Sequence, residues 1–283
     1  MKPLYTVLAA VAISACAMGT ALADDITADV LTYDGKTKTV TAKGNVVIHA
    51  NQGATITAKN GQYHFKDRSA FLDGGVHYVK DSSTLDAQKL FLYKDKTTRG
   101  VGNVYFNDSV EKRVLKGDDV IYNPDTGFGK IEGNGYLKSP DGIVQAPHIE
   151  GNMKQVKIVA TGGVNLSSEL HEATGYGDRA VYTRTGREGT DGKLVLTGNA
   201  WVNQKGNTFN GPELVLRDAD KVVETTGRST IVIVNTGAAD NNGEKDSSPG
   251  SGKSEPKGPV TEATPIEGRP DIPENPLETK EPK

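Results

Sequence analysis

Apolar and polar residues alternate along most of this 283-residue chain, and the alternation recurs in two motifs. In the first motif every second residue is small or apolar and the central one is glycine, as in Val40, Ala42, Gly44, Val46 and Ile48. Because side chains alternate between the two faces of a strand, this spacing predicts a β-strand with one apolar face. The central glycines recur 28 to 36 residues apart, at Gly44, Gly74, Gly102, Gly133, Gly162, Gly198 and Gly227.

A second motif alternates with the first and contains one three-residue step. Ile56, Ala58, Gly61 and Tyr63 form one of its seven copies. A β-bulge or a local bend at this step keeps both halves of the strand facing the same side. Helical periodicity is absent from the repeats, and polar turns such as Asp34-Gly35 separate the motifs.

The two motifs together define seven repeats of about thirty residues between about residues 26 and 235. Each repeat supplies two strand segments. The pattern therefore predicts an all-β fold, an antiparallel arrangement of about 14 strands, or 16 if bulges split the longer ones.

The glycine column has two possible explanations, because glycine weakens the interior of a strand. Glycine either permits twist and close packing of two facing sheets around a filled core, or it keeps an apolar groove open between them. An apolar groove suits acyl chains, since each buried methylene contributes about 0.8 kcal/mol. The candidate lipid-binding residues on this inner face are Val46, Ile48, Leu72, Val76, Val104, Phe106, Ile131, Leu137, Val164, Leu166, Leu196 and Val202.

The two ends of such a stack are open sheet edges, which are templates for pairing with another copy. Ile26 and Leu31 lie in the first segment, and Ile231 and Ile233 lie in the last one. These four residues are the candidate docking edges. A covered terminal strand remains the alternative for the last segment.

The termini differ in composition from the repeats. An apolar stretch followed by Ala21-Leu22-Ala23 predicts a signal peptide over residues 1–23. Cys16, the only cysteine, lies in a lipobox-like string, so acylation there is the alternative to cleavage after Ala23. The Pro-, Gly-, Glu- and Lys-rich residues 236–283 predict a disordered tail, which leaves residues 24–235 as the β domain.

Four strings in the repeats carry a family resemblance: Ala42-Lys43-Gly44-Asn45-Val46-Val47-Ile48, Gly102-Asn103-Val104-Tyr105, Gly177-Asp178-Arg179-Ala180-Val181-Tyr182 and Leu196-Thr197-Gly198-Asn199-Ala200-Trp201-Val202. They resemble the OstA-like domain of the LptA family of lipopolysaccharide-transport periplasmic proteins. The resemblance covers about residues 25–235. It implies an elongated, open β-jelly roll that binds the lipid A part of lipopolysaccharide in its interior.

The same resemblance implies partners and a location. They are further copies of the chain joined head to tail, and inner- and outer-membrane transport components on either side of the periplasm. The polar tail is longer than is typical of the family. A membrane-anchored LptC-like component is the second choice, and the lipobox-like Cys16 keeps it open.

Charge and candidate chemistry narrow the function further. The net charge of −3 argues against a nucleic-acid binder that relies on an overall basic field. The five histidines lack metal-site spacing, and Asp118-Asp119 is more typical of solvated charge than of an acid–base pair. Basic residues that suit either a groove mouth facing lipid phosphates or a mixed charged surface are Lys94, Lys96, Arg99, Lys112, Arg113 and Lys116.

We therefore expect a non-enzymatic lipid carrier that needs no metal or cofactor. A structural or adhesive β-solenoid with a filled interior is the alternative from a different class. Interior volume separates these two hypotheses. An enzyme, such as a polysaccharide-active β-helix, would require a carboxylate pair that does not stand out in the sequence.

Overall fold

The structure, a computed structural model, describes most of the repeat region. Residues 1–22, which include Cys16, and the predicted tail lie outside the described residues. No described helix is long and apolar enough to cross a membrane. The described residues are 23–50, 53–140, 142–152, 154–169, 172–184, 191–217 and 222–234.

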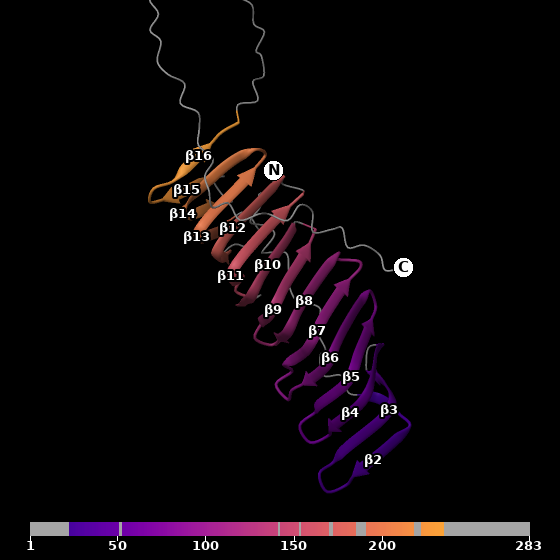
Figure 1. Cartoon of the computed structure of the whole chain (residues 1–283). Helices are drawn as coiled ribbons and strands as arrows, with labels where there is room; N and C mark the ends of the chain where they lie inside the picture. Colours follow the sequence, from indigo (N-terminus) through magenta and orange to yellow (C-terminus); the bar gives the residue numbers. More distant parts are fainter. Residues whose placement is uncertain are drawn as a thin grey trace, which may run out of the picture. The chain divides into compact units, whose positions relative to one another are not determined.

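Sixteen strands form one open antiparallel sheet whose strand order follows the chain (Figure 1). This confirms the predicted all-β fold class and strand number. The strands are β1 (Ala23–Thr27), β2 (Val30–Asp34), β3 (Thr39–Ala50), β4 (Ala54–His64), β5 (Ser69–Lys80), β6 (Ser83–Leu92), β7 (Thr98–Asp108), β8 (Arg113–Tyr122), β9 (Phe128–Ser139), β10 (Gly142–Asn152), β11 (Lys157–Ser168), β12 (Ala173–Thr183), β13 (Lys193–Gln204), β14 (Asn207–Arg217), β15 (Val223–Thr226) and β16 (Thr230–Val232).

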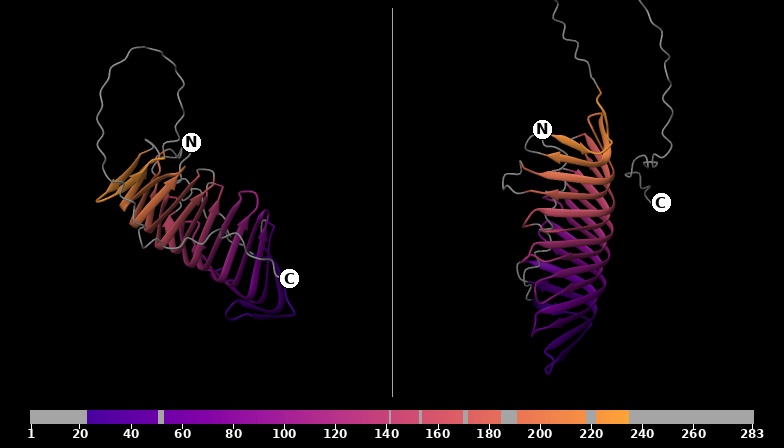
Figure 2. Two further views of the ribbon diagram at one scale, coloured as in Figure 1. Left: turned by 45° about the horizontal axis from the view of Figure 1, so that its top comes forward. Right: turned by 90° about the vertical axis from the view of Figure 1, so that its left-hand side faces the viewer.

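Two short strands share each end position of the sheet. β1 and β2 both pair with β3, and β15 and β16 both pair with β14. The sixteen strands therefore occupy fourteen positions, which matches two strand segments in each of seven repeats. Figure 2 shows these positions stacked one after another from β2 to β16.

The central glycines lie at bends in the strands. In β3, Gly44 and Asn45 both adopt left-handed backbone angles, with φ of +73° and +46°. The pairing with β4 skips from Lys43 to Val46 at this point. Left-handed pairs recur at Gly74-Gly75, Gly102-Asn103, Gly133-Asn134, Gly162-Gly163 and Gly198-Asn199. We call this row of bends the crease, because each long strand changes direction there.

The crease corrects the interpretation of the glycine column. A Cβ atom on Gly133 would lie 2.2 Å from a carboxylate oxygen of Asp118, and none of the crease glycines is buried. The side-chain amide of Asn134 donates a hydrogen bond to that same carboxylate at 2.8 Å. The glycines therefore permit a bend and a close approach of the neighbouring strand. They neither pack in the core nor hold a groove open.

The three-residue step of the second motif is repaired as predicted. In β4 the pairing with β5 skips from Thr57 to Asn60, directly opposite the crease of β5. Ile56 and Tyr63, on either side of this step, are both buried. Each strand thus contributes apolar side chains from both of its halves to one common core.

The crease predicts a measurable difference between two glycines. Gly133→Ala is expected to lower the free energy of unfolding by about 1–3 kcal/mol, because φ is +70° and the new methyl group meets Asp118. Gly75→Ala is the matched control, since its φ is +88° but its Cβ meets no atom within 4 Å. Gly75→Ala should lower the free energy of unfolding only by the cost of placing an alanine in a left-handed conformation. Denaturant unfolding compares the two, and equal losses would contradict the close approach at Gly133.

Candidate functional site

The interior contains all twelve apolar side chains that the alternation assigned to the inner face. Ile48 is partly buried and packs against the core, and the other eleven have at most 4% of their surface exposed. Leu90, a core residue outside that set, has none of its surface exposed. The alternating pattern therefore identified which residues face inward. Their contact with a lipid remains a prediction.

Five core side chains between β9 and β14 are tightly packed, and we call this part of the sheet the filled half. Ile131, Val144, Val164, Leu196 and Leu214 have no accessible surface, so no space large enough for a water molecule touches them. A continuous open groove, one of the two explanations for the glycine column, is therefore absent at these positions. The described residues of this half match the filled-interior alternative instead.

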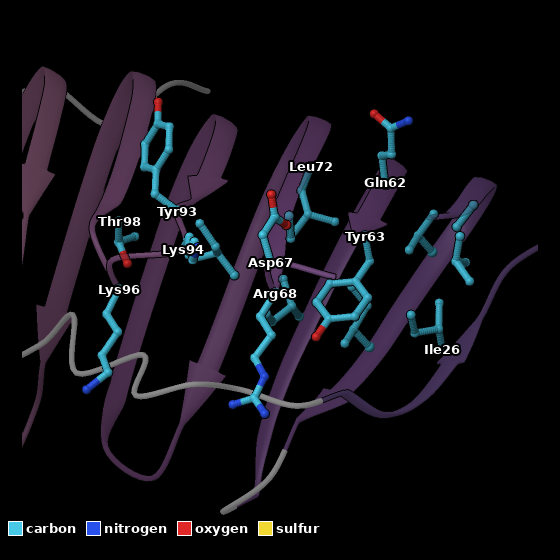
Figure 3. Close-up of a pocket in the computed structure, with 18 of the residues that line it drawn as sticks. Ile26, Gln62, Tyr63, Asp67, Arg68, Leu72, Tyr93, Lys94, Lys96 and Thr98 are labelled. Atoms are coloured by element: carbon cyan, nitrogen blue, oxygen red, sulfur yellow. The ribbon is translucent and has the colours of Figure 1, made fainter. Parts of the chain in front are cut away.

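A cavity of about 340 Å³ opens in the interior at the other end of the sheet (Figure 3). Three of the twelve candidate lipid-binding residues, Val46, Ile48 and Leu72, line it. The periodicity could not single them out, because the same pattern occurs in every repeat. The other apolar lining residues include Ile26, Val40, Ala42, Ile56, Tyr63, Ala70 and Leu92.

The cavity lies beside the first position of the sheet. β1 and β2 are five residues each, and together they pair with nearly the whole length of β3, the first long strand. Every residue of β2 is exposed.

Two turns form the mouth of the cavity: residues 65–68 between β4 and β5, and 93–97 between β6 and β7. Burial raises the pKa of Tyr63 at this mouth, and the nearby Arg68 acts in the opposite direction. Hydrogen bonds from the Ser69 hydroxyl and amide lower the pKa of Asp67. The mouth is therefore charged and polar, whereas the cavity behind it is apolar.

Only two of the six basic residues considered for a groove mouth line the cavity, namely Lys94 and Lys96. Arg99 binds Asp119, with 2.9 Å between Nε and Oδ1, and this interaction raises the arginine pKa. Lys116 lies over the rings of Tyr105 and Tyr136.

The remaining two basic residues belong to the opposite rim. Arg113 binds Glu111 in the region of the β7–β8 turn, at 3.2 Å, and Lys112 lies in the same turn. Arg113 and Lys112 therefore belong to a mixed charged surface, which was the alternative to a groove mouth. The mouth also contains Lys66 and Arg68, which sequence reasoning missed. Their position in a turn that repeats 28 residues later was the available signal.

The candidate docking residues lie at the two ends of the sheet. Ile26 is partly buried and lines the cavity, whereas Leu31 is 48% exposed. Ile231 and Ile233 are 51% and 61% exposed at the other end. Within the described part of the chain, each terminal position thus combines a strand edge that pairs with no further strand with exposed apolar side chains.

The described histidines contact polar groups on neighbouring strands. His77 lies 2.6 Å from Asp86, and His148 lies 2.8 Å from Glu132. Among the described residues no three His, Cys, Asp or Glu side chains form a group that could hold a metal ion. His171 lies outside the described residues.

Comparison with known proteins identifies the family. The model described as "LptA/(LptD N-terminal domain) LPS transport protein" matches residues 55–222, more than half of the chain. The chain belongs to this family. The resemblance noted in the sequence is therefore confirmed, and membership of the LptA family gives the protein a role in lipopolysaccharide transport.

A solved structure is also similar to the chain. It is the crystal structure of LptH, described as the LptA homologous periplasmic component of the conserved lipopolysaccharide transport device from Pseudomonas aeruginosa. The two are 17% identical, the match covers 45% of this chain and 99% of LptH, and the TM-score is 0.37. A search of curated proteins finds no match.

Proposed function

We propose that this LptA-family protein is a periplasmic carrier that holds acyl chains of lipopolysaccharide inside its folded sheet and bridges the two membranes by end-to-end assembly. The observation that carries the proposal is the apolar cavity at the β1–β7 end, which is continuous with the apolar core. No catalytic step is needed for this function, because the work is the transfer of apolar surface out of water.

The size of the cavity limits how much of a lipid it holds. Pockets for small molecules typically enclose about 300–1,000 Å³. The cavity of about 340 Å³ is at the lower end of that range. It therefore accommodates part of a lipid, such as one acyl chain, and a larger load requires movement of neighbouring side chains.

The filled half of the sheet makes transport along the interior stepwise. A chain moving from β7 towards β14 must displace side chains such as Ile131 and Leu196, which are fully buried. Each displacement exchanges protein–protein apolar contact for protein–lipid contact of the same kind. The net free-energy change is small because neither state exposes apolar surface to water.

The filled half is also the observation that favours the alternative, a structural β-solenoid without a lipid. A carrier binds lipid and a structural β-solenoid does not, so a lipid-binding measurement distinguishes the two functions. A membrane-anchored LptC-like protein differs from the carrier at Cys16, which lies outside the described residues. Mass spectrometry of the mature N-terminus distinguishes acylation at Cys16 from cleavage after Ala23.

The exposed edges support end-to-end assembly. β2 is exposed along its whole length, and β16 at the other end is exposed as well. Unpaired strand edges form main-chain hydrogen bonds with a second copy readily. Because the two edges belong to opposite ends of the sheet, pairing one with the other produces a head-to-tail stack.

Filling the cavity is expected to weaken lipid binding. Ala70 lines the cavity, so Ala70→Phe places a ring where an acyl chain would lie. Thr174→Phe adds the same ring to the exposed outer side of β12 and is the matched control. Titration with purified lipopolysaccharide should give about tenfold weaker binding for Ala70→Phe, equivalent to the burial of a few methylenes. Wild-type protein that binds no lipopolysaccharide would overturn the carrier function.

Charges on the terminal edges are expected to block assembly. Leu31→Lys or Ile231→Lys should keep the protein monomeric in light scattering at concentrations where the wild type associates, because edge lysines oppose strand pairing. Val110→Lys is the control, since Val110 is 72% exposed in a turn away from both ends. An equimolar mixture of the two edge variants should form dimers and nothing longer. Wild-type protein that stays monomeric, or a mixture that stays monomeric, would contradict head-to-tail pairing.

A further inference from the structure

The two turns at the cavity mouth repeat one short sequence. Phe65-Lys66-Asp67-Arg68-Ser69 and Tyr93-Lys94-Asp95-Lys96-Thr97 each contain an aromatic residue, a lysine, an aspartate, a second cation and a hydroxyl residue. Their four cations all line the mouth, and Arg68 and Lys96 extend to the same side of the strands (Figure 3). The cavity thus has a basic entrance in front of an apolar interior.

The aspartates of these turns are engaged with their own backbone. Asp67 accepts hydrogen bonds from the amide of Ser69 at 3.1 Å and from its hydroxyl at 2.8 Å. Asp95 accepts one from the amide of Thr97 at 3.0 Å. These bonds favour the ionised carboxylates and lower both aspartate pKa values. The aspartates therefore shape the turns.

Three of the four cations remain available to a ligand. Lys96 binds Asp125, with 2.9 Å between Nζ and Oδ2. Lys66, Arg68 and Lys94 form no ion pair with any residue that the structure describes. Adjacent strands lie about 4.8 Å apart, so the two turns, two strand positions apart, are separated by roughly 10 Å. Long basic side chains from both turns can reach one anion between them.

The β6–β7 turn separates the cavity from a second hollow on the outside. Tyr93, Lys94 and Thr97 line both the interior cavity and an external cleft of about 640 Å³. Arg99, held by Asp119, lies in the external cleft. An amphiphile placed across this turn would have its apolar chain inside and its polar group outside.

Exposed aromatic rings mark the same boundary. Phe65 and Tyr93 are 50% and 42% exposed, and Tyr63 packs edge-on against Phe65 with their ring centroids 4.9 Å apart. Aromatic rings with a polar tip favour positions where an apolar region meets water. Their position agrees with a lipid whose headgroup begins at the mouth.

We propose that Lys66, Arg68 and Lys94 form a headgroup subsite that binds a phosphate group of the lipid whose acyl chain occupies the cavity. The proposal rests on the carrier function and adds a chemical preference to it, for phosphate-bearing over uncharged lipids. Arg68 supplies a planar fork that suits two phosphate oxygens, and the lysines supply point charges. The mouth of the β1–β7 end would then determine which lipids enter.

The test compares two charge-neutralised triple variants of the purified protein. The mouth variant is Lys66→Gln/Arg68→Gln/Lys94→Gln. The control variant, Lys138→Gln/Lys157→Gln/Lys193→Gln, removes the same charge from exposed positions on β9, β11 and β13. Each protein is titrated by calorimetry with soluble phosphorylated lipid A and with its dephosphorylated form.

The mouth variant is expected to bind phosphorylated lipid A about tenfold more weakly than the wild type, as three exposed charge contacts of modest strength predict. Its affinity for the dephosphorylated form should equal that of the wild type and of the control. The difference should shrink as salt concentration rises, because the contacts are exposed. Equal affinities of mouth and control variants for phosphorylated lipid A would overturn the subsite while leaving the carrier function intact.

Two further arms separate the remaining explanations. Wild-type protein that binds neither lipid form would overturn both the carrier function and the subsite. Inorganic phosphate alone should bind far more weakly than the lipid, and equal affinity would overturn the headgroup assignment in favour of a site for the free anion. Arg68→Lys keeps the charge but loses the fork, so it should weaken binding of phosphorylated lipid A less than Arg68→Gln does, and equal losses would contradict a charge contact of Arg68 with the phosphate.

Discussion

The fold depends on a pair of left-handed residues that recurs at the same level in every second long strand, from β3 to β13. Gly133 and Asn134 illustrate it, with φ of +70° and +48° and with Asp118 of the preceding strand accepting a hydrogen bond from the asparagine amide. Antiparallel partners must pair on both sides of each bend, so the bend in one strand determines the register step in the next. The bends therefore align into one crease, and the sheet folds along it.

The crease also gives the sheet one continuous core. Both halves of every strand direct apolar side chains to the same side, so the core is continuous along the stack. Between β9 and β14 core side chains such as Ile131, Val164 and Leu196 have no accessible surface. At the first position the strand is divided into β1 and β2, and the cavity lies beside it. The turns at that same end contain the basic residues of the proposed headgroup subsite.

Much of this architecture could be predicted from the sequence. Period-two alternation identified the inward residues, and seven repeats gave the number of strand positions. The alternation placed the central glycines on the inner face of a straight strand, because Ala42 and Val46, on either side of the bend in β3, are an even number of residues apart. A straight strand and a bent one therefore show the same alternation. The asparagine after Gly44, Gly102, Gly133 and Gly198 was the missing signal, since asparagine tolerates left-handed angles better than most residues.

The location of the cavity could not be predicted, because the same inward-facing pattern occurs in every repeat. Hydrogen exchange with and without bound lipopolysaccharide tests the account most directly. We expect bound lipopolysaccharide to slow the exchange of backbone amides in β3 to β7 and in the turns at residues 65–68 and 93–97. Exchange in β10 to β14 should change little at first. Protection confined to β10–β14, or spread evenly over the sheet, would contradict an entrance at the β1–β7 end.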